Sequence, residues 1–464
     1  MTIDTVLNAA TAAMPSALER LFELLRIPSI STDQAYAGDC NRAADWLVDD
    51  LKSIGFDASR RDTTGHPMVV AHHDGDGPHI LFYGHYDVQP VDPLDLWHSD
   101  PFDPKIEDTL LGKVIRARGA SDDKGQLMTF VEACRALKAE TGKLPCKTTI
   151  LFEGEEESGS PSLLPFLKEN ADELRADYAF VCDTGMWDAD TPAICTTLRG
   201  LLGEELTITA ADMDLHSGAY GGPAANPLRV LSDILSGLHD ETGRVTIDGF
   251  YDGVTPISNT TRAGWESLGF DAKEYLGTVG LSHPAGEKGF DTLAQLWARP
   301  TAEINGIWGG YTGAGFKTVL PAKAHAKISF RLVGQQDPHQ IRKNFRAYVK
   351  CMLPPDCAVE FAEHGTAPAT VLPSEDEVFV QSSNALSAEW PNKNVFVGGG
   401  GSIPIVGLFQ EILGMNSVMI GFAQDDDQIH APNEKYNLRS FEKGIRSWVR
   451  VLSSLNGTVR QKFS

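Results

Sequence analysis

Four carboxylates lie within five residues of one another, directly after the short apolar run 150–152. They belong to Glu153, Glu155, Glu156 and Glu157. Like charges this close cannot all stay ionised unless solvent, a proton or a metal ion compensates them. The cluster therefore indicates either a solvated turn, which is the usual meaning of a charge run, or one half of a metal site.

Other possible metal ligands follow three further apolar runs of the kind that form buried strands. These are His85 and Asp87 after residues 80–83, Asp183 after 178–182, and His430 after 417–420 and the aspartates 425–427. In open α/β sheets, ligands bind in the crevice outside the carboxyl ends of the strands. Side chains that are far apart in the sequence can therefore converge at one edge of the predicted sheet.

Asp122 and Asp123 form another acidic pair, just before the helix that the pattern predicts from about residue 124. Aspartate in this position either caps the helix by accepting its free N–H groups or binds a ligand. His85 and Asp87 are two residues apart in an extended segment and point to the same side, which suits a carboxylate that orients a metal-bound imidazole. A lone histidine would more commonly be a core or surface residue.

The combined ligand set contains imidazole and carboxylate groups but no thiolate. Such a set fits Zn, Mn or Co in an open catalytic site better than a closed structural zinc site. Two aspartates, a glutamate and two histidines are enough for two ions that share one carboxylate. Two ions about 3.5 to 4 Å apart polarise a carbonyl and activate water, which is the chemistry of metal-assisted amide hydrolysis. A glutamate left without a metal could then be the general base.

The elements around these residues predict an α/β fold with a mixed, largely parallel sheet flanked by helices. Amphipathic helices are indicated over 41–55 and 124–138, and short apolar strands over 80–83, 148–152, 178–182 and 417–420. Strands that alternate with helices in this way favour parallel pairing.

The pattern changes near residue 200. Residues 204–210 and 326–333 alternate apolar and polar side chains, as half-exposed strands of an antiparallel sheet do. We therefore predict an α+β domain over 200–367, inserted into a catalytic domain made of 1–199 and 368–464.

Charge and cysteine content restrict the class of protein. Sixty-three acidic and forty basic residues give a net charge of −23, which opposes binding to nucleic acid or to anionic lipid. The seven cysteines contain no C-x-x-C pair, which favours reduced thiols in a cytoplasm. Neither a signal peptide nor an apolar span of about eighteen residues is evident. We expect a cytoplasmic protein without a nucleic-acid or membrane partner.

Seven short motifs relate the chain to a known enzyme family. They are GHYDVQP (84–90), RGASDDKG (118–125), EGEEESGS (153–160), LHSG (215–218), SFRLV (329–333), GGSIP (400–404) and HAPNEK (430–435). With these motifs in this order, the chain resembles the dimetal zinc exopeptidases of the carnosinase, carboxypeptidase G and aminoacylase family, and most closely their cytosolic dipeptidases. One departure is Ala117, where the family usually has glycine.

The resemblance implies two metal sites per subunit that share one carboxylate, with zinc as the first expectation and manganese or cobalt as alternatives. The ligands would be Asp122 as the bridge, His85 and Asp183 at one ion, and Glu157 and His430 at the other. Glu156 would be the general base and later the proton donor, and Asp87 would lie behind His85.

The resemblance also assigns residues of the inserted domain, which in this family is a lid and dimerisation domain. His216 would stabilise the oxyanion, commonly in the active site of the partner subunit, so a homodimer is expected. Arg331 and the backbone around Gly401 and Ser402 would hold the substrate carboxylate, as a guanidinium fork and a run of free N–H groups can.

Three functions are compatible with these residues. The first is a dimetal hydrolase that cleaves dipeptides or short peptides with a free C-terminal carboxylate, because members with aspartate at the position of Asp183 recognise a free substrate amine. The second is an N-acyl amino acid deacylase, since Arg331 serves both substrates. The third is a non-catalytic metal-binding protein, which would need neither Glu156 nor His216.

Overall fold

The computed structural model describes residues 2–401 and 403–455, which form two compact units. Unit 1 contains the described residues up to Thr196, Leu372–Val397 and those from Leu408 onward, whereas unit 2 contains the described residues of Thr197–Val371 and Gly398–Gly407. Ser402, which is predicted to bind the substrate carboxylate, lies outside the described residues.

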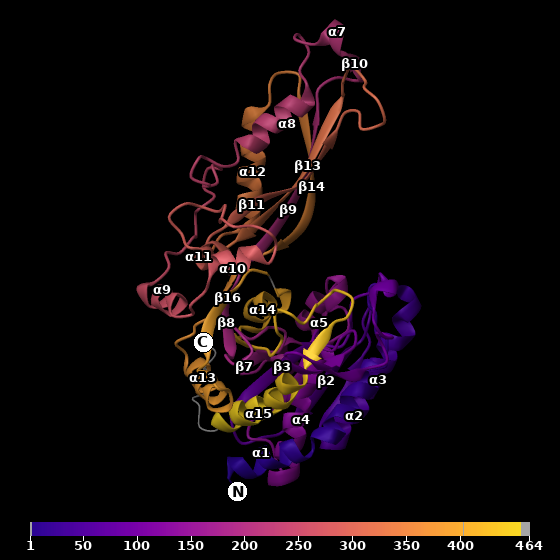
Figure 1. Cartoon of the computed structure of the whole chain (residues 1–464), viewed down its shortest axis with the longest axis vertical. Helices are drawn as coiled ribbons and strands as arrows, with labels where there is room; N and C mark the ends of the chain where they lie inside the picture. The colour runs from indigo at the N-terminus through magenta and orange to yellow at the C-terminus, as the bar shows by residue number, and fades with distance from the viewer. Residues whose placement is uncertain (1, 402, 456–464) are drawn as a thin grey trace. The chain divides into compact units, whose positions relative to one another are not determined.

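A mixed sheet runs through unit 1 (Figure 1). Its strands, in spatial order, are β1 (Asp57–Arg61), β2 (Met68–His73), β6 (Lys147–Glu153), β3 (His79–His85), β7 (Tyr178–Val181), β17 (Ser417–Ile420), β8 (Ala193–Leu198) and β15 (Thr370–Val371), with β16 (Val395–Gly399) also paired to β8. The neighbours β6, β3, β7 and β17 are parallel, while β1, β2 and β8 pair antiparallel. These four parallel strands are the four predicted apolar runs, so the prediction of a mixed, largely parallel sheet is confirmed. A smaller sheet joins β18 (Lys435–Asn437), β5 (Gly112–Arg116) and β4 (Lys105–Thr109).

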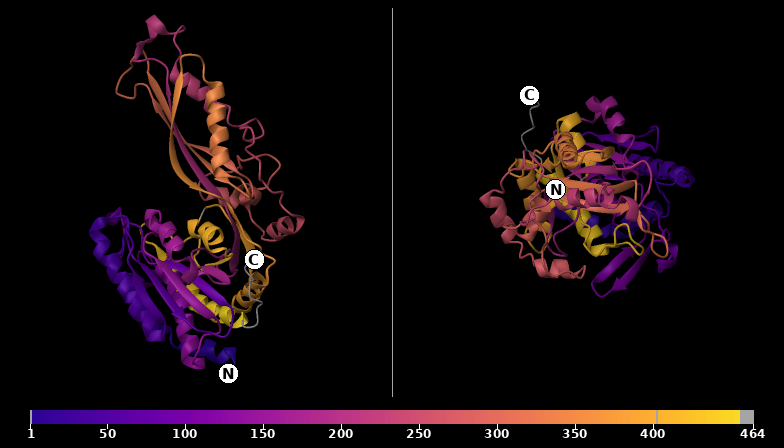
Figure 2. Two further views of the ribbon diagram at one scale, coloured as in Figure 1. Left: turned by 180° about the vertical axis from the view of Figure 1, so that it is seen from behind. Right: turned by 90° about the horizontal axis from the view of Figure 1, so that it is seen from above.

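Helices flank the sheet of unit 1. They are α1 (Ile3–Ala12), α2 (Met14–Leu25), α3 (Ala37–Ile54), α4 (Lys124–Thr141), α5 (Leu163–Glu169), α6 (Ala171–Leu174), α13 (Glu377–Glu389) and α15 (Leu438–Ser454), with the short helices η1 (Gln34–Tyr36), η2 (Leu94–Leu96), η3 (Glu156–Ser158) and η4 (Phe409–Leu413). The helices α1, α2 and α15 all pack against α4 (Figure 2). The helices predicted over 41–55 and 124–138 are α3 and α4.

Aromatic packing joins β3, α4 and α15. Phe82 stacks on Phe130 with ring centroids 3.7 Å apart, and Trp448 meets Phe82 edge-on at 5.5 Å. All three side chains are fully buried, and aromatic pairs in such arrangements add to the free energy gained from burial alone. This packing holds β3, which ends at His85, against α4, which begins directly after the Asp122 loop.

Unit 2 is built on an antiparallel sheet with the strand order β11 (Thr301–Gly309), β13 (Lys323–Leu332), β9 (Gly200–Thr209) and β14 (Ala358–Ala367). Helices α8 (Pro227–Ser236) and α12 (Pro338–Met352) lie along this sheet (Figure 1). The remaining elements are α7 (Ser217–Tyr220), α9 (Asn259–Glu266), α10 (Ala272–Gly277), α11 (Thr292–Trp297), β10 (Leu215–His216) and β12 (Val319–Leu320), while α14 (Pro404–Leu408) leads back into unit 1. Buried and partly exposed positions alternate along β9, as its sequence predicts.

The described residues of 398–407 belong to unit 2, whereas the sequence-based boundary at 367 and 368 assigns this segment to the catalytic domain. The reason is local hydrogen bonding to the residue just before β9. The main-chain N–H of Arg199 donates to the carbonyls of Gly399 and Gly401, and its Nε donates to the carbonyl of Gly400 at 3.0 Å. Within the described part of the chain, no helix has the length and apolar character needed to cross a membrane.

Candidate metal centre and catalytic site

The predicted metal ligands sit at one edge of the unit 1 sheet. His85 is the last residue of β3, Glu157 lies in η3 after β6, and Asp183 follows β7. His430 lies in the loop after β17, and Asp122 precedes α4. Because β3, β6, β7 and β17 are parallel, their carboxyl ends meet at the same edge of the sheet.

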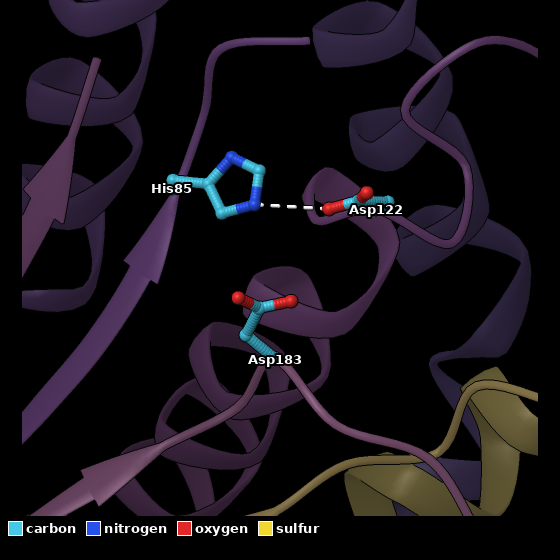
Figure 3. A group of neighbouring side chains, drawn as sticks. All are labelled: His85, Asp122 and Asp183. Carbon is cyan, nitrogen blue, oxygen red and sulfur yellow. Dashed lines mark hydrogen bonds and ion pairs between the residues drawn. The ribbon is translucent and has the colours of Figure 1, made fainter. Parts of the chain in front are cut away.

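Two groups of ligands share Asp122. In the first, formed with His85 and Asp183, the possible ligand atoms lie within 4.8 Å of one another (Figure 3). In the second, formed with Glu157 and His430, they satisfy the same limit. His85 Nε2 lies 3.0 Å from Asp122 Oδ1, while His430 Nε2 lies 2.9 Å from Oδ2 and 3.2 Å from Glu157 Oε2. Asp122 therefore offers one carboxylate oxygen to each group.

The electrostatics of these groups suit cations. Burial raises the pKa of Asp183 well above its ordinary value, and the negative charges of Asp122 and Glu156 add to this effect. Burial also disfavours the charge of Asp122, but hydrogen bonds from His430 and His85 outweigh it and hold the pKa of Asp122 low. Glu157 Oε1 is buried without a hydrogen-bond partner among the described residues. A carboxylate and imidazole set with an unsatisfied buried oxygen fits two divalent ions.

Asp87 lies behind His85. His85 Nδ1 is 3.1 Å from the carbonyl of Asp87 and 3.4 Å from its carboxylate Oδ1. The same carboxylate accepts hydrogen bonds from Ser31 Oγ at 2.6 Å and from the N–H groups of Glu156 and Glu157. Asp87 thus fixes both the imidazole ring of His85 and the backbone at Glu156 and Glu157. Residues that surround a metal site commonly orient its ligands in this way.

The four glutamates of the cluster have separate environments. Glu153 accepts a hydrogen bond from Tyr83 Oη at 2.6 Å, and Glu155 accepts from the N–H groups of His66 and Ser162. Both are buried, so neither is solvated and both support the fold. Glu156 has no side-chain hydrogen bond to any residue that the structure describes, and burial raises its pKa to about 6.

Asp122 and Asp123, the acidic pair before α4, also differ in what they contact. Asp123 occupies the N-cap position of α4 without a side-chain capping bond, and its Oδ2 instead accepts from the N–H of His85 at 3.1 Å. Helix capping is therefore not the function of this pair. Asp122 faces the histidines, and Asp123 fixes the backbone at the end of β3.

The loop that carries Asp122 is held by a buried glutamate. Glu434 accepts hydrogen bonds from the N–H groups of Gly119, Ser121 and Asp122 at 2.9 to 3.0 Å, and Arg118 Nη1 lies 2.8 Å from its carboxylate. Both side chains of this ion pair are almost fully buried. Such a pair specifies one loop conformation, because either charge alone would be uncompensated.

The predicted substrate residues His216, Arg331 and Gly401 lie in unit 2. His216 is exposed, and its Nδ1 accepts from the N–H of Gly218. Arg331, near the end of β13, has no ion-pair or hydrogen-bond partner among the described side chains. Burial and the nearby charge of Arg331 lower the pKa of Arg199 to about 10. Arg199, whose guanidinium lies next to the 399–401 backbone, and the nearby Arg331 form a candidate receptor for a carboxylate.

The model of Peptidase family M20/M25/M40 matches residues 81–454. The chain belongs to this family. Among its relatives, the Cys-Gly metallodipeptidase DUG1 of Saccharomyces cerevisiae is 28% identical over 97% of both chains, and the Beta-Ala-His dipeptidase of Homo sapiens is 28% identical over 79% of this chain and 73% of the relative.

Solved structures of M20 peptidases have the same fold. The M20 metallo-carboxypeptidase Sso-CP2 from Sulfolobus solfataricus has a TM-score of 0.82 with 30% identity, covering 95% of this chain and 99% of that protein. Human carnosine dipeptidase 1 has a TM-score of 0.78 with 25% identity, covering 98% and 99%. These findings confirm the predicted family, the fold and a dipeptidase-type metallopeptidase.

Sequence reasoning missed three residues of this M20 peptidase that position the site. Ser31 supports Asp87, Glu434 holds the Asp122 loop, and Arg199 lies beside Arg331. Glu434 could have been predicted from the sequence, since it is an acidic residue inside the motif at 430–435. No sequence pattern around Ser31 or Arg199 indicates its role, because the partners of both residues are remote in the sequence.

Proposed function

We propose that this metallopeptidase hydrolyses the peptide bond of dipeptides, using two divalent ions held by the two ligand groups that share Asp122. The observation that carries the proposal is the geometry of Asp122 between His85 and His430. In addition, the side chain of Glu156 makes no hydrogen bond to the described residues. When bound at such ligands, two ions polarise the scissile carbonyl and make water more acidic. Zinc is the first candidate, with manganese or cobalt as alternatives.

Glu156 acts as the general base in this proposal. It takes the proton from the attacking water and later gives it to the leaving amine. Its pKa of about 6, raised by burial, suits proton transfer near neutral pH, where a base must be ionised but not too weak. Asp87 positions Glu156 through its main-chain N–H and so sets the distance between base and metal ligands.

The substrate carboxylate binds in unit 2. Arg331, Arg199 and the backbone N–H groups around Gly401 and Ser402 receive it, and His216 stabilises the oxyanion from the partner subunit of a homodimer. An edge strand with exposed apolar residues supports the dimer, because such edges pair readily with another chain. β11 is such an edge, and Ile304, Ile307 and Trp308 are exposed along it.

We also propose a cytoplasmic location. All seven cysteines lie in the part of the chain that the structure describes, and no disulfide joins them. Reduced thiols are typical of that compartment.

The second candidate function is an N-acyl amino acid deacylase. The same pair of guanidinium groups, Arg331 and Arg199, would bind the carboxylate of an acylated amino acid, and the metal ligands would be unchanged. The two candidates differ only at the other end of the substrate, where a dipeptide carries a free amine and an acylated amino acid does not. A non-catalytic metal-binding role would leave Glu156 and His216 without a purpose.

A substrate panel decides between these functions. The Zn- or Mn-loaded protein is incubated with dipeptides, including Cys-Gly and β-Ala-His, and with N-acetyl amino acids, and released amino acids are measured. We expect turnover of dipeptides that is abolished by a chelator and restored by metal. Turnover confined to the acylated substrates would establish the deacylase instead, and no turnover of either class would support the non-catalytic alternative.

A further inference from the structure

A cavity of about 400 Å³ in unit 1 borders the metal ligand Asp183. It lies between the loop after β7 and the loop after β17. Its lining consists of Gln126, Asp183, Thr184, Gly185, Ala423, Gln424, Asp425, Gln428 and Ile429. A volume of this size is within the range of small-molecule sites, and it directly adjoins the proposed reaction centre.

The lining of this cavity is polar and negatively charged. It contains two carboxylates and three side-chain amides, and none of the described residues that line it is a lysine or arginine. Once Asp183 binds a metal, Asp425 carries the remaining negative charge of the lining. The cavity therefore has a net preference for a positively charged guest.

Asp425 differs from its two acidic neighbours. Asp426 and Asp427 both pair with Lys435 Nζ, at 2.8 Å and 2.9 Å. Asp425 is exposed and has no ion-pair or hydrogen-bond partner among the described residues. Its carboxylate is thus the one in the triplet 425–427 that remains available to a ligand.

Hydrogen bonds to a buried aspartate fix the loop that carries Asp425. Asp427 is fully buried and accepts hydrogen bonds from Ser121 Oγ and from the N–H of Gln424, both at 2.8 Å. Gln428 has a φ of +57°, in the left-handed region that non-glycine residues rarely adopt and that is common at binding sites. Because Ser121 is also part of the loop that carries Asp122, the cavity wall and the metal ligands are positioned by one network.

We propose that this cavity receives the side chain of the substrate residue on the amino side of the scissile bond, and that Asp425 selects lysine or arginine at that position. This inference rests on the proposed function. In that function the carboxylate of the C-terminal residue is bound by residues of unit 2, whereas every residue that lines the cavity belongs to unit 1. The amino-terminal residue is therefore the part of a dipeptide that is left for the cavity next to Asp183.

The lining explains the selection physically. A basic side chain can pair with Asp425 and donate to the amide oxygens of Gln424 and Gln428, so its charge and its N–H groups are all matched. An apolar side chain would leave these polar groups without partners, and an acidic one would meet the charge of Asp425. Specificity for basic side chains then arises both from their favourable contacts and from the unfavourable burial of apolar and acidic side chains.

The test compares Lys-Gly, Ala-Gly and Glu-Gly as substrates of the wild type and of Asp425→Asn. We expect wild type to prefer Lys-Gly over Ala-Gly in kcat/KM. Asp425→Asn should reduce that preference about fivefold to thirtyfold, mainly through KM, because one charged partner is lost. Asp425→Lys should shift the preference toward Glu-Gly.

Asp426→Asn is the matched control. It makes the same change of charge one residue away, on a side chain that faces Lys435 and does not line the cavity, and Asp427 keeps Lys435 paired. It should leave the ratio of Lys-Gly to Ala-Gly unchanged. Equal loss of the ratio in both variants would overturn the assignment by showing a general effect of charge.

Calorimetric binding to Mn-loaded Glu156→Gln protein separates this inference from the proposed function. If dipeptides are hydrolysed but Asp425→Asn changes Lys-Gly and Ala-Gly equally, the cavity assignment is wrong and the function stands. If no dipeptide is hydrolysed, yet Lys-Gly binds more tightly than Ala-Gly only while Asp425 is present, the function is wrong and the cavity assignment stands. If binding shows no such difference either, both are wrong.

Discussion

At the scale of single residues, the site depends on which way neighbouring carboxylates point. Asp122 faces two histidines, whereas Asp123 accepts the N–H of His85. Glu155 is held by main-chain donors, while the Glu156 side chain has no such bonds to the described residues. Chemically identical groups thus receive different roles from their surroundings, as acid and base pairs in enzymes commonly do.

Replacing Glu156 by glutamine tests the assignment of the base. Glu156→Gln removes the proton acceptor but keeps the size and shape of the side chain, so metal binding and fold should be retained. We expect kcat to fall by about 10²-fold to 10⁴-fold. The measurement is steady-state hydrolysis of a dipeptide, together with metal content and circular dichroism.

Glu155→Gln is the control for that variant. Glu155 accepts hydrogen bonds from the N–H groups of His66 and Ser162, so the substitution should lower the free energy of unfolding by about 1 to 3 kcal/mol while kcat stays close to that of wild type. An unchanged kcat in Glu156→Gln, or a larger loss in Glu155→Gln, would place the base elsewhere.

At the scale of elements, loops between β-strands and helices carry the proposed metal ligands, and buried polar contacts hold these loops in place. The loop 118–122 follows β5, and Glu434, directly before β18, binds three of its N–H groups. Because β18 pairs with β5, the small sheet brings Glu434 to the loop that leads into α4.

Glu434→Gln should weaken both the fold and the metal centre. The amide has one acceptor oxygen, so it cannot bind all three N–H groups, and Arg118 loses its charged partner. We expect a loss of about 3 to 5 kcal/mol in the free energy of unfolding, since a buried charge is left unpaired. Urea unfolding and calorimetric metal titration measure the two effects.

Glu107→Gln provides a matched control on the same small sheet. Glu107 pairs with Arg116 at 2.6 Å, but its side chain is about one-third exposed. Breaking such a pair should cost at most about 1 kcal/mol and leave metal affinity unchanged. Similar losses in both variants would contradict the role assigned to Glu434.

The buried imidazole of His79, the first residue of β3, should make the free energy of unfolding depend on pH. Burial lowers its pKa to about 4, and its Nε2 lies 2.8 Å from Thr149 Oγ1. The unfolded chain, with an ordinary histidine pKa near 6.5, binds the proton more readily than the fold does. The contribution of neutral His79 is therefore fully present above pH 6.5 and is lost as pH falls toward 4.

His79→Gln should flatten this pH dependence. We expect the difference in unfolding free energy between wild type and variant to change by up to about 2 kcal/mol between pH 6.5 and 4, allowing for the partial exposure of the ring. Urea unfolding at a series of pH values measures it. Parallel curves for the two proteins would exclude His79 as the source.

At the scale of the whole molecule, the proposed chemistry needs residues from both units and from two copies of the chain. The proposed metal ligands and the proposed base belong to unit 1, while His216 and Arg331 belong to unit 2. If His216 acts in the partner subunit's site, each active site contains residues of two chains.

Mixing two inactive variants tests this arrangement. His216→Ala and Glu156→Gln homodimers should each be strongly impaired, because an oxyanion donor or a base is missing. After subunit exchange, a heterodimer contains one site with both residues intact, so activity should recover in part. Dipeptide hydrolysis is followed after mixing differently tagged variants, with co-purification to establish exchange. No recovery despite exchange would place His216 in the site of its own subunit.

The sequence alone determined which residue types meet at the site and where the elements lie. Apolar runs of strand length, each followed by an acid or a histidine, are local patterns, and the four parallel strands β3, β6, β7 and β17 follow from them. Since parallel strands end at one sheet edge, the approximate convergence of His85, Asp183 and His430 could also be predicted. The proposed roles of Asp122 as the shared ligand and of Glu156 as the base came from family resemblance.

Only the tertiary structure decided how each carboxylate is used. The separation of Glu153 and Glu155 from Glu156, and of Asp122 from Asp123, depends on donors from distant segments, and no local pattern encodes these. Ser31 and Arg199 were missed for the same reason. Side-chain direction in a loop is set by the buried polar contacts that close it, and those contacts exist only when remote parts of the chain have come together.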